Sequence, residues 1–267
     1  MGEEIGAPAP GDTESSTRRF FDSAFDEPIY DGAHRRYYLL CCAPRSGSWL
    51  LCDLLRRSGA LGVPAEYFQP GRDAKVLAQR FGLERQGTID VHRYAAAVKR
   101  HRTTANGVFG CKLQYWHMPA LIKERVVSRH FPAAKIVHLS RNDVVAQGVS
   151  LAIAEQTEQY VRFRDDAGEV QRPAQPSFDE ARVMKAIDYV LRDELKWKKF
   201  FAMNGLQPLR LTYEALLEDP QRTCQQLARY VGVDTDHAFS LADTDLLRQS
   251  NELNEEWIKR IKALAAY

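Results

Sequence analysis

The chain has 267 residues, a mass of 30.4 kDa and a hydrophobic share of 45%. This size fits one large α/β domain or two small ones with a sizeable core. A net charge of +2 and a pI of about 8.2 argue against nucleic acid as a partner. A local anion site needs no overall excess of positive charge and stays open.

The sequence favours a soluble, cytoplasmic protein. No apolar run approaches the roughly 20 residues that a transmembrane helix requires, so we expect no transmembrane segment. The polar N-terminus also lacks the apolar stretch of a secretion signal. The five cysteines show no CxxC or other metal-ligand spacing, which indicates buried free thiols in a reducing compartment and no metal. They are Cys41, Cys42, Cys52, Cys111 and Cys224.

Residues 1–30 are rich in Gly, Pro, Ser and acidic side chains. We expect them to form a disordered or loosely ordered arm, followed by one domain over residues 31–267. The continuous apolar run at 36–43 is typical of a buried parallel strand. A helix with leucines at helical spacing follows from residue 48 to near residue 59.

Further strands and helices alternate along the rest of the chain, which predicts an α/β fold with a central parallel sheet flanked by helices. A segment rich in Gly, Pro and charge at 165–177 indicates a loop. The amphipathic C-terminal stretch packs either on the domain or on a second subunit. Strands are expected at 108–115, 134–141 and within 206–216, and helices at 118–131, 142–163, 178–205, 219–233 and 250–267.

The segment "PRSGS" lies between the first strand and its helix. Backbone N–H groups at such a turn, together with the helix dipole, form an anion cradle. Gly47 allows close approach of the backbone, Ser46 and Ser48 offer hydroxyls, and Arg45 offers a guanidinium. The alternative is an ordinary strand-to-helix turn with a polar tip. The Walker A lysine is absent, which disfavours an ATP or GTP site.

A second candidate pair is Arg141 and Ser150. Arg141 follows a strand, at the edge of the sheet where α/β proteins bind ligands. Ser150 lies two to three turns into the next helix, and the two side chains could hold one phosphate. In the alternative, Arg141 pairs with Asp143 at the surface. The segment at 211–233 carries no chemistry of its own.

Together, "PRSGSWLL", "SRNDVVAQGVS" and "LTYEALLEDPQRTCQQLARYVGV" resemble the sulfotransferase superfamily that uses 3′-phosphoadenosine 5′-phosphosulfate (PAPS). The segments "PRSGSWLLCDLLRRSGALGVPAEYFQP", "GVFGCKL", "SLAIAEQT" and "NEEWIKR" are similar to the bacterial trehalose 2-sulfotransferase-like family within it. The resemblance runs from about Tyr37 to near the C-terminus. It implies a P-loop-NTPase-like sulfotransferase fold, PAPS as donor, adenosine 3′,5′-bisphosphate as product and no metal. It also suggests a homodimer.

The resemblance implies the residues of the donor site. Trp49 stands where relatives carry Thr or Ser, so only its backbone N–H can serve there. Arg141 and Ser150 would hold the 3′-phosphate, although they lie one residue further apart than in the cytosolic animal relatives. Arg248 is the candidate for a C-terminal phosphate clamp. The loop around the 5′-phosphosulfate would comprise Arg45, Ser46, Gly47, Ser48, Trp49 and Leu50.

The same resemblance places a general base at Glu66, within "VPAEYF". Beside two aromatic residues this carboxylate would be partly desolvated and therefore more basic. The alternative is an ordinary solvated glutamate. Many relatives use a His in a Lys-x-His segment, whereas this chain has Lys112 followed by Gln114, with His117 at the wrong spacing. Lys112 could stabilise the bridging oxygen or merely end a strand, and we expect His138 to be a core residue.

The acceptor is expected to be a carbohydrate or a glycolipid. At two positions where the trehalose enzyme binds sugar through Glu and Gln, this chain has Val63 and Pro44. The neighbouring aromatic residues suit stacking on a sugar ring, or they belong to the core. The candidate acceptor residues are Pro44, Val63, Tyr67, Phe68, Gln69 and Trp116, with Tyr115 nearby. Two alternatives stay open, a P-loop nucleotide-dependent kinase and a non-catalytic anion-binding domain of the same fold.

Overall fold

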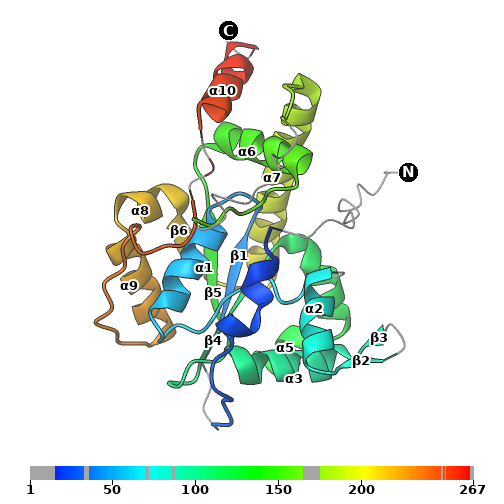
Figure 1. The fold of residues 1–267 in the computed structure, drawn as a ribbon, viewed down its shortest axis with the longest axis vertical. Helices are drawn as coiled ribbons and strands as arrows, with labels where there is room; N and C mark the ends of the chain where they lie inside the picture. The colour runs from blue at the N-terminus through cyan, green and yellow to red at the C-terminus, as the bar shows by residue number, and fades with distance from the viewer. Residues whose placement is uncertain are drawn as a thin grey trace.

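A parallel four-stranded sheet in the order β4-β1-β5-β6 runs through the centre of the protein (Figure 1). The computed structural model describes residues 16–32, 36–69, 72–85, 88–164, 175–247, 249 and 251–264. In the register of the sheet, Leu40 pairs with Lys112 on one side and with Val137 on the other. The predicted parallel sheet is therefore confirmed. Its strands are β1 (Arg36–Cys42), β4 (Val108–Leu113), β5 (Lys135–Ser140) and β6 (Leu209–Thr212).

Successive residues of β1 point to opposite faces of the sheet, as the pleat requires. Leu40 and its alternate neighbours meet α1 (Ser48–Arg57) and α9 (Pro220–Val231). Leu39 meets a second core cluster, which includes α3 (Val91–Arg102). The continuous apolar run of β1 thus reflects burial on both faces.

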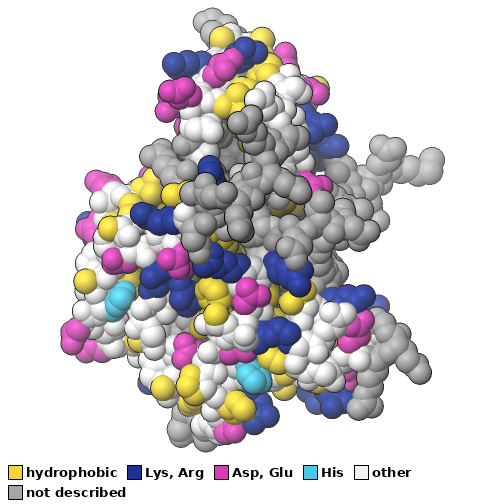
Figure 2. All heavy atoms as spheres, in the orientation of Figure 1, with side chains coloured by type: hydrophobic (Ala, Val, Ile, Leu, Met, Phe, Trp, Pro, Cys, Tyr) yellow, Lys and Arg dark blue, Asp and Glu magenta, His cyan; other side chains and the backbone are white. Residues whose placement is uncertain are grey.

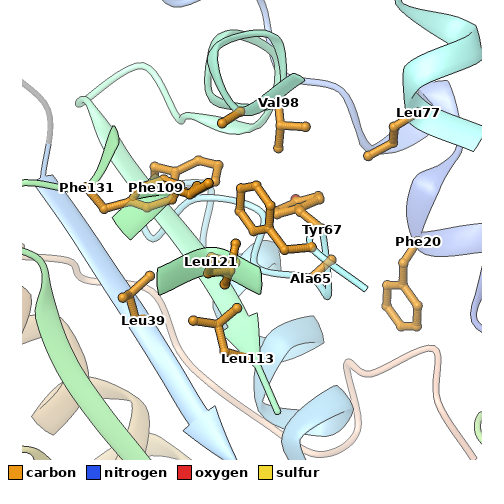
Figure 3. Close-up of a cluster of buried hydrophobic side chains, with 14 of the residues drawn as sticks. Phe20, Leu39, Ala65, Tyr67, Leu77, Val98, Phe109, Leu113, Leu121 and Phe131 are labelled. Atoms are coloured by element: carbon orange, nitrogen blue, oxygen red, sulfur yellow. The ribbon is translucent and has the colours of Figure 1, made fainter. Parts of the chain in front are cut away.

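An aromatic group organises that second core cluster (Figure 3). The rings of Phe109 and Phe131 are stacked, with centroids 5.4 Å apart and an angle of 8°. Tyr67 stacks on the same Phe109 at 5.8 Å. This contact joins the segment after α1 to β4 and to the residue that follows α5 (Val126–His130). Aromatic pairs of this kind stabilise a core beyond the area that they bury.

Three helices form a third cluster beyond the sheet, at the top of Figure 1. They are α6 (Val144–Thr157), α7 (Glu180–Met203) and α10 (Glu252–Leu264). A Cβ at Gly148 would lie 2.3 Å from the Ile187 side chain, which shows how closely α6 and α7 approach. Trp257 and Ile261 pack α10 onto this cluster, one of the two alternatives for the C-terminal helix. Among the described helices, none has the length and apolarity to cross a bilayer.

Two predicted helices were too long. The helix expected at 118–131 is split into α4 (Met118–Lys123) and α5, because Arg125 adopts a left-handed conformation with φ 52°. The helix expected at 142–163 ends at Thr157, where Glu158 has φ 54°. Of the predicted loop, residues 165–174 lie outside the described residues.

Other elements were not predicted, and the elements around β6 and near the N-terminus complete the fold. Residues 59–107, to which no pattern assigned an element, contain helices and a short hairpin. This stretch contains α2 (Arg72–Arg80), α3 and the hairpin of β2 (Glu84–Arg85) and β3 (Thr88–Ile89). The other unpredicted elements are η1 (Arg18–Phe21), η2 (Ser23–Phe25), η3 (Tyr115–His117) and α8 (Tyr213–Glu218).

Residues 16–32 pack against the domain, which differs from the loosely ordered arm expected over residues 1–30. Phe20 and Phe21 are 2% and 0% exposed. The buried Arg102 guanidinium donates to the backbone carbonyls of Phe20, Asp22 and Phe25. The free energy gained by burying two aromatic rings and by hydrogen-bonding the backbone carbonyls offsets the entropy cost of ordering this polar segment. Residues 1–15 lie outside the described residues.

Replacing Phe109 with Ala should lower the free energy of unfolding by about 3–5 kcal/mol, because it removes a ring stacked on two others. Urea unfolding followed by circular dichroism would measure the loss. Leu195→Ala on α7 is the control, because Leu195 is 65% exposed; its effect should stay within about 0.5 kcal/mol. Equal effects of the two substitutions would contradict this assignment of the core.

Candidate active site

The turn between β1 and α1 presents an unblocked helix N-terminus at the carboxyl edge of the sheet. Gly47 caps α1 with φ 82°, and a Cβ there would lie 2.3 Å from the Tyr213 ring. Ser46 is fully buried, and its Oγ has no hydrogen-bond partner within the described part of the chain. Gly47 itself has no side chain that could cap the helix. Its first N–H groups and the Ser46 hydroxyl are therefore suited to an anionic ligand.

Arg45 joins this turn to α6. It has φ 60°, and its side chain extends away from the cradle: Nε donates to Ser150 Oγ at 2.9 Å. The other guanidinium nitrogens donate to the Tyr160 carbonyl and to Gln249 Oε1. Desolvation by burial, with the charge of Arg141 as a further cause, lowers the pKa of Arg45 to about 10. The structure thus brings Arg45, Arg141 and Ser150 together.

Arg141 lies beside the turn. Its guanidinium carbon lies 4.8 Å from the centroid of the Tyr213 ring, which also contacts the Gly47 position. Asp143, the alternative partner of Arg141, instead caps α6 by accepting from Ala146 N. Arg248 lies outside the described residues, although its neighbour Gln249 reaches Arg45.

Glu66 and Lys112 form a buried ion pair beside the turn. They are 4% and 1% exposed, and Lys112 Nζ lies 3.3 Å from Glu66 Oε2. Glu66 is therefore desolvated rather than an ordinary loop glutamate. Lys112 Nζ also lies 3.8 Å from the centroid of the Trp49 ring, a cation–π contact. This contact places the carboxylate–ammonium pair against the start of α1.

Gln114 is the site residue to which sequence reasoning gave no role. Its Nε2 donates to Glu66 Oε1 at 2.5 Å, and its Oε1 accepts from Trp116 Nε1 at 3.0 Å. A signal for it existed, because Lys112 and Gln114 alternate at the end of a strand and point to the same face. Trp116, predicted to contact the acceptor, reaches the Glu66 carboxylate through Gln114.

The other predicted acceptor residues are dispersed. Tyr67 and Phe68 belong to the core, which favours the core alternative for both rings. The Tyr67 hydroxyl donates to the carbonyl of Val63, itself buried. The carbonyl of Pro44 accepts from Gln147 Nε2 at 2.7 Å.

The remaining predicted residues pack in the core or lie partly buried. Gln69 is half-buried. Leu50 lies in α1 and packs, partly buried, against the core cluster that contains Leu40. Tyr115 packs edge-on against Trp197, at 5.2 Å between ring centroids. The buried His138 pairs with Glu194 at 3.1 Å, as expected of a core residue. All five cysteines are buried and free, as predicted.

The charge on the face seen in Figure 2 is mixed. Figure 2 shows Lys and Arg side chains interspersed with acidic and apolar ones over one face, in keeping with the net charge of +2. Selectivity for an anion therefore depends on a few placed groups rather than on the overall field.

A parallel sheet with a glycine turn, an open helix N-terminus and two clustered arginines defines an α/β protein of the phosphate-loop class. The Stf0 sulphotransferase family matches residues 37–264, and the chain belongs to this family. It is therefore a sulfotransferase.

Named relatives and a solved structure agree with this family. The chain is 28% identical to a trehalose 2-sulfotransferase of Mycobacterium tuberculosis, over 86% of this chain and 96% of the relative. It is 26% identical to one of Mycolicibacterium smegmatis, over 86% and 95%. The sulfotransferase domain from the curacin biosynthetic pathway has a TM-score of 0.50 and 18% identity, over 76% of this chain and 75% of that domain. This likeness confirms the predicted sulfotransferase fold.

Gly47→Ala should disrupt the turn, because the new Cβ would overlap the Tyr213 ring that packs on Arg141. Gly59→Ala is a matched control: Gly59 has φ 62°, and a Cβ added there would meet no atom within 4 Å. The control should lose only the left-handed strain of about 1–2 kcal/mol. Gly47→Ala should lose more stability and also weaken binding of adenosine 3′,5′-bisphosphate about tenfold. Urea unfolding and calorimetry measure the two effects, and equal behaviour of the variants would contradict the role of the Tyr213 contact.

Proposed function

We propose that this protein transfers the sulfuryl group of PAPS to a hydroxyl group of a carbohydrate or glycolipid acceptor, with Glu66 as general base. The observation that carries the proposal is the buried Glu66–Lys112 pair beside the open N-terminus of α1. A buried carboxylate next to the N-terminus of α1 supports in-line transfer, in which a proton acceptor and an anion site must lie close together. The names of the two mycobacterial relatives support a sugar acceptor.

The donor would occupy the turn and the arginine cluster. The backbone N–H groups at the start of α1 and the Ser46 hydroxyl would bind the 5′-phosphosulfate. Arg141 and Ser150 would bind the 3′-phosphate, with Arg45 holding Ser150 in place through its 2.9 Å hydrogen bond. We retain Arg248 as an additional phosphate ligand.

The transfer step follows from this placement. Glu66 takes the proton of the acceptor hydroxyl as its oxygen attacks sulfur, and the bond from sulfur to the phosphate oxygen breaks. Adenosine 3′,5′-bisphosphate leaves with that oxygen, whose developing negative charge Lys112 stabilises. Lys112 and Gln114 each contact one oxygen of the Glu66 carboxylate and hold it in place.

The acceptor need not be trehalose. Val63 and Pro44 stand where the resemblance implies two polar sugar contacts, and neither side chain can donate or accept a hydrogen bond. Trp116 and Gln69 are half-buried, and their polar atoms are candidates for contact with the acceptor. The expected homodimer and cytoplasmic location stay predictions.

Arg141→Ala should weaken the binding of adenosine 3′,5′-bisphosphate by about 10- to 150-fold, because it removes a charge-assisted contact of about 1.5–3 kcal/mol. Calorimetry without Mg²⁺ measures the change. Arg192→Ala, on the exposed side of α7, controls for the lost charge and should leave binding unchanged. Absence of binding by the unmodified protein would contradict PAPS as the donor. Mg²⁺-dependent ATP binding would favour the kinase alternative.

Glu66→Gln should reduce turnover by about 10²–10⁴-fold, since the amide cannot accept the hydroxyl proton. The assay uses labelled PAPS with trehalose, glucose and glycolipid acceptors. Binding of adenosine 3′,5′-bisphosphate should persist, which separates a lost base from a lost fold. An unimpaired variant would remove Glu66 from the mechanism, and turnover by neither protein would favour the non-catalytic alternative.

A further inference from the structure

A chain of side-chain contacts surrounds the Glu66 carboxylate. Lys112 Nζ lies 3.3 Å from Oε2, and Gln114 Nε2 donates to Oε1 at 2.5 Å. Trp116 Nε1 then donates to Gln114 Oε1 at 3.0 Å. Both carboxylate oxygens are thereby engaged, one by an ammonium and one by an amide.

Trp116 fixes which group donates and which accepts in the hydrogen bonds between Trp116, Gln114 and Glu66. An indole N–H can only donate, so the oxygen of the Gln114 amide must face it. The NH₂ group of the same amide then faces Glu66, and NH₂ can only donate as well. The carboxylate oxygen on that side is therefore held as an acceptor, which a protonated carboxyl group would satisfy less well.

The backbone of Gln114 is also held by hydrogen bonds. Gln114 follows directly after β4, and its N–H donates to His117 Nδ1 at 3.1 Å. The Gln114 carbonyl accepts from His117 N at 3.1 Å. Burial lowers the pKa of His117 to about 4, so above that pH the ring is neutral and Nδ1 can accept. The turn is thus closed by a reciprocal pair of hydrogen bonds.

We propose that Gln114, oriented by Trp116, is a positioning residue that holds the Glu66 carboxylate in its proton-accepting form and direction. This inference rests on the proposed role of Glu66 as general base. In this chain an amide stands where many relatives carry the histidine of a Lys-x-His segment.

The pH dependence of the reaction tests this role, since the groups around Glu66 are known. Lys112 is the cation that pairs with Glu66. When the Gln114 side chain is removed, Lys112 is the contact in this group that still donates to the carboxylate. The other titratable groups whose charges interact with Glu66 are His117 of η3, Tyr189 of α7, Cys42 of β1, Cys52 of α1 and Cys111 of β4. Loss of one donor should make the carboxylate easier to protonate, and the acidic limb of the rate profile should move to higher pH.

The experiment compares Gln114→Ala, Gln114→Glu and Trp116→Phe with the unmodified protein. Gln114→Ala should lower kcat about 10- to 100-fold with the acidic limb moved to higher pH, because a misdirected base loses alignment. Gln114→Glu should move the limb further, since two carboxylates at hydrogen-bond distance share a proton. Trp116→Phe keeps the amide but frees its orientation, and should give a smaller change in the same direction. Binding of adenosine 3′,5′-bisphosphate should be unchanged in all three.

Gln79→Glu on α2 is the control for the added charge, because Gln79 is exposed. Its rate profile should match that of the unmodified protein. A loss of kcat without any movement of the acidic limb would show a structural role and overturn the proposal, as would full activity of Gln114→Ala and Gln114→Glu. In either case an inactive Glu66→Gln would leave the proposed function intact, whereas an active Glu66→Gln would overturn that function itself.

Discussion

The central position of β1 in the sheet is the constraint on which the site depends. Leu40 pairs with Lys112 of β4 and with Val137 of β5, and all three strands run in the same direction. The carboxyl ends of these strands therefore lie at one edge of the sheet. The turn after β1, Lys112 near the end of β4 and Arg141 after β5 are thus neighbours at that edge. Burial on both faces holds this pairing in one register, because a shift by one residue would turn every apolar side chain to the wrong side.

Trp49 connects the turn between β1 and α1 to the buried pair of Glu66 and Lys112. Its ring stacks on Phe20 at 4.2 Å, and Lys112 Nζ lies 3.8 Å from its centroid. A buried ammonium requires compensation, which Lys112 receives from the Glu66 carboxylate and from the negative face of the indole. The residue that departs from the Thr or Ser of relatives is thus part of the electrostatic environment of the proposed base.

The sequence predicted the parallel sheet, the turn after β1 and the helices α1, α7, α9 and α10, because these features depend on local periodicity and on glycine and proline placement. It predicted no helix at α2, α3 or α8. It missed the packing of residues 16–32, since composition does not show that Phe20 and Phe21 find a core. The helix break at Arg125 is a left-handed residue without a glycine to mark it. Side-chain direction was also beyond reach: Tyr67 could stack on a sugar or fill the core, and long-range contacts decided for the core.

The contact of Phe20 with Trp49, and of Trp49 with Lys112, has a consequence for how this sequence can change over time. The three residues come from the N-terminal segment, the start of α1 and β4, so no local pattern relates them. Replacing Trp49 alone with Thr would leave Phe20 without its stacking partner and Lys112 without the ring face. Positions 20, 49 and 112 are therefore expected to vary together among descendants of this chain, and the order of their substitutions would be restricted.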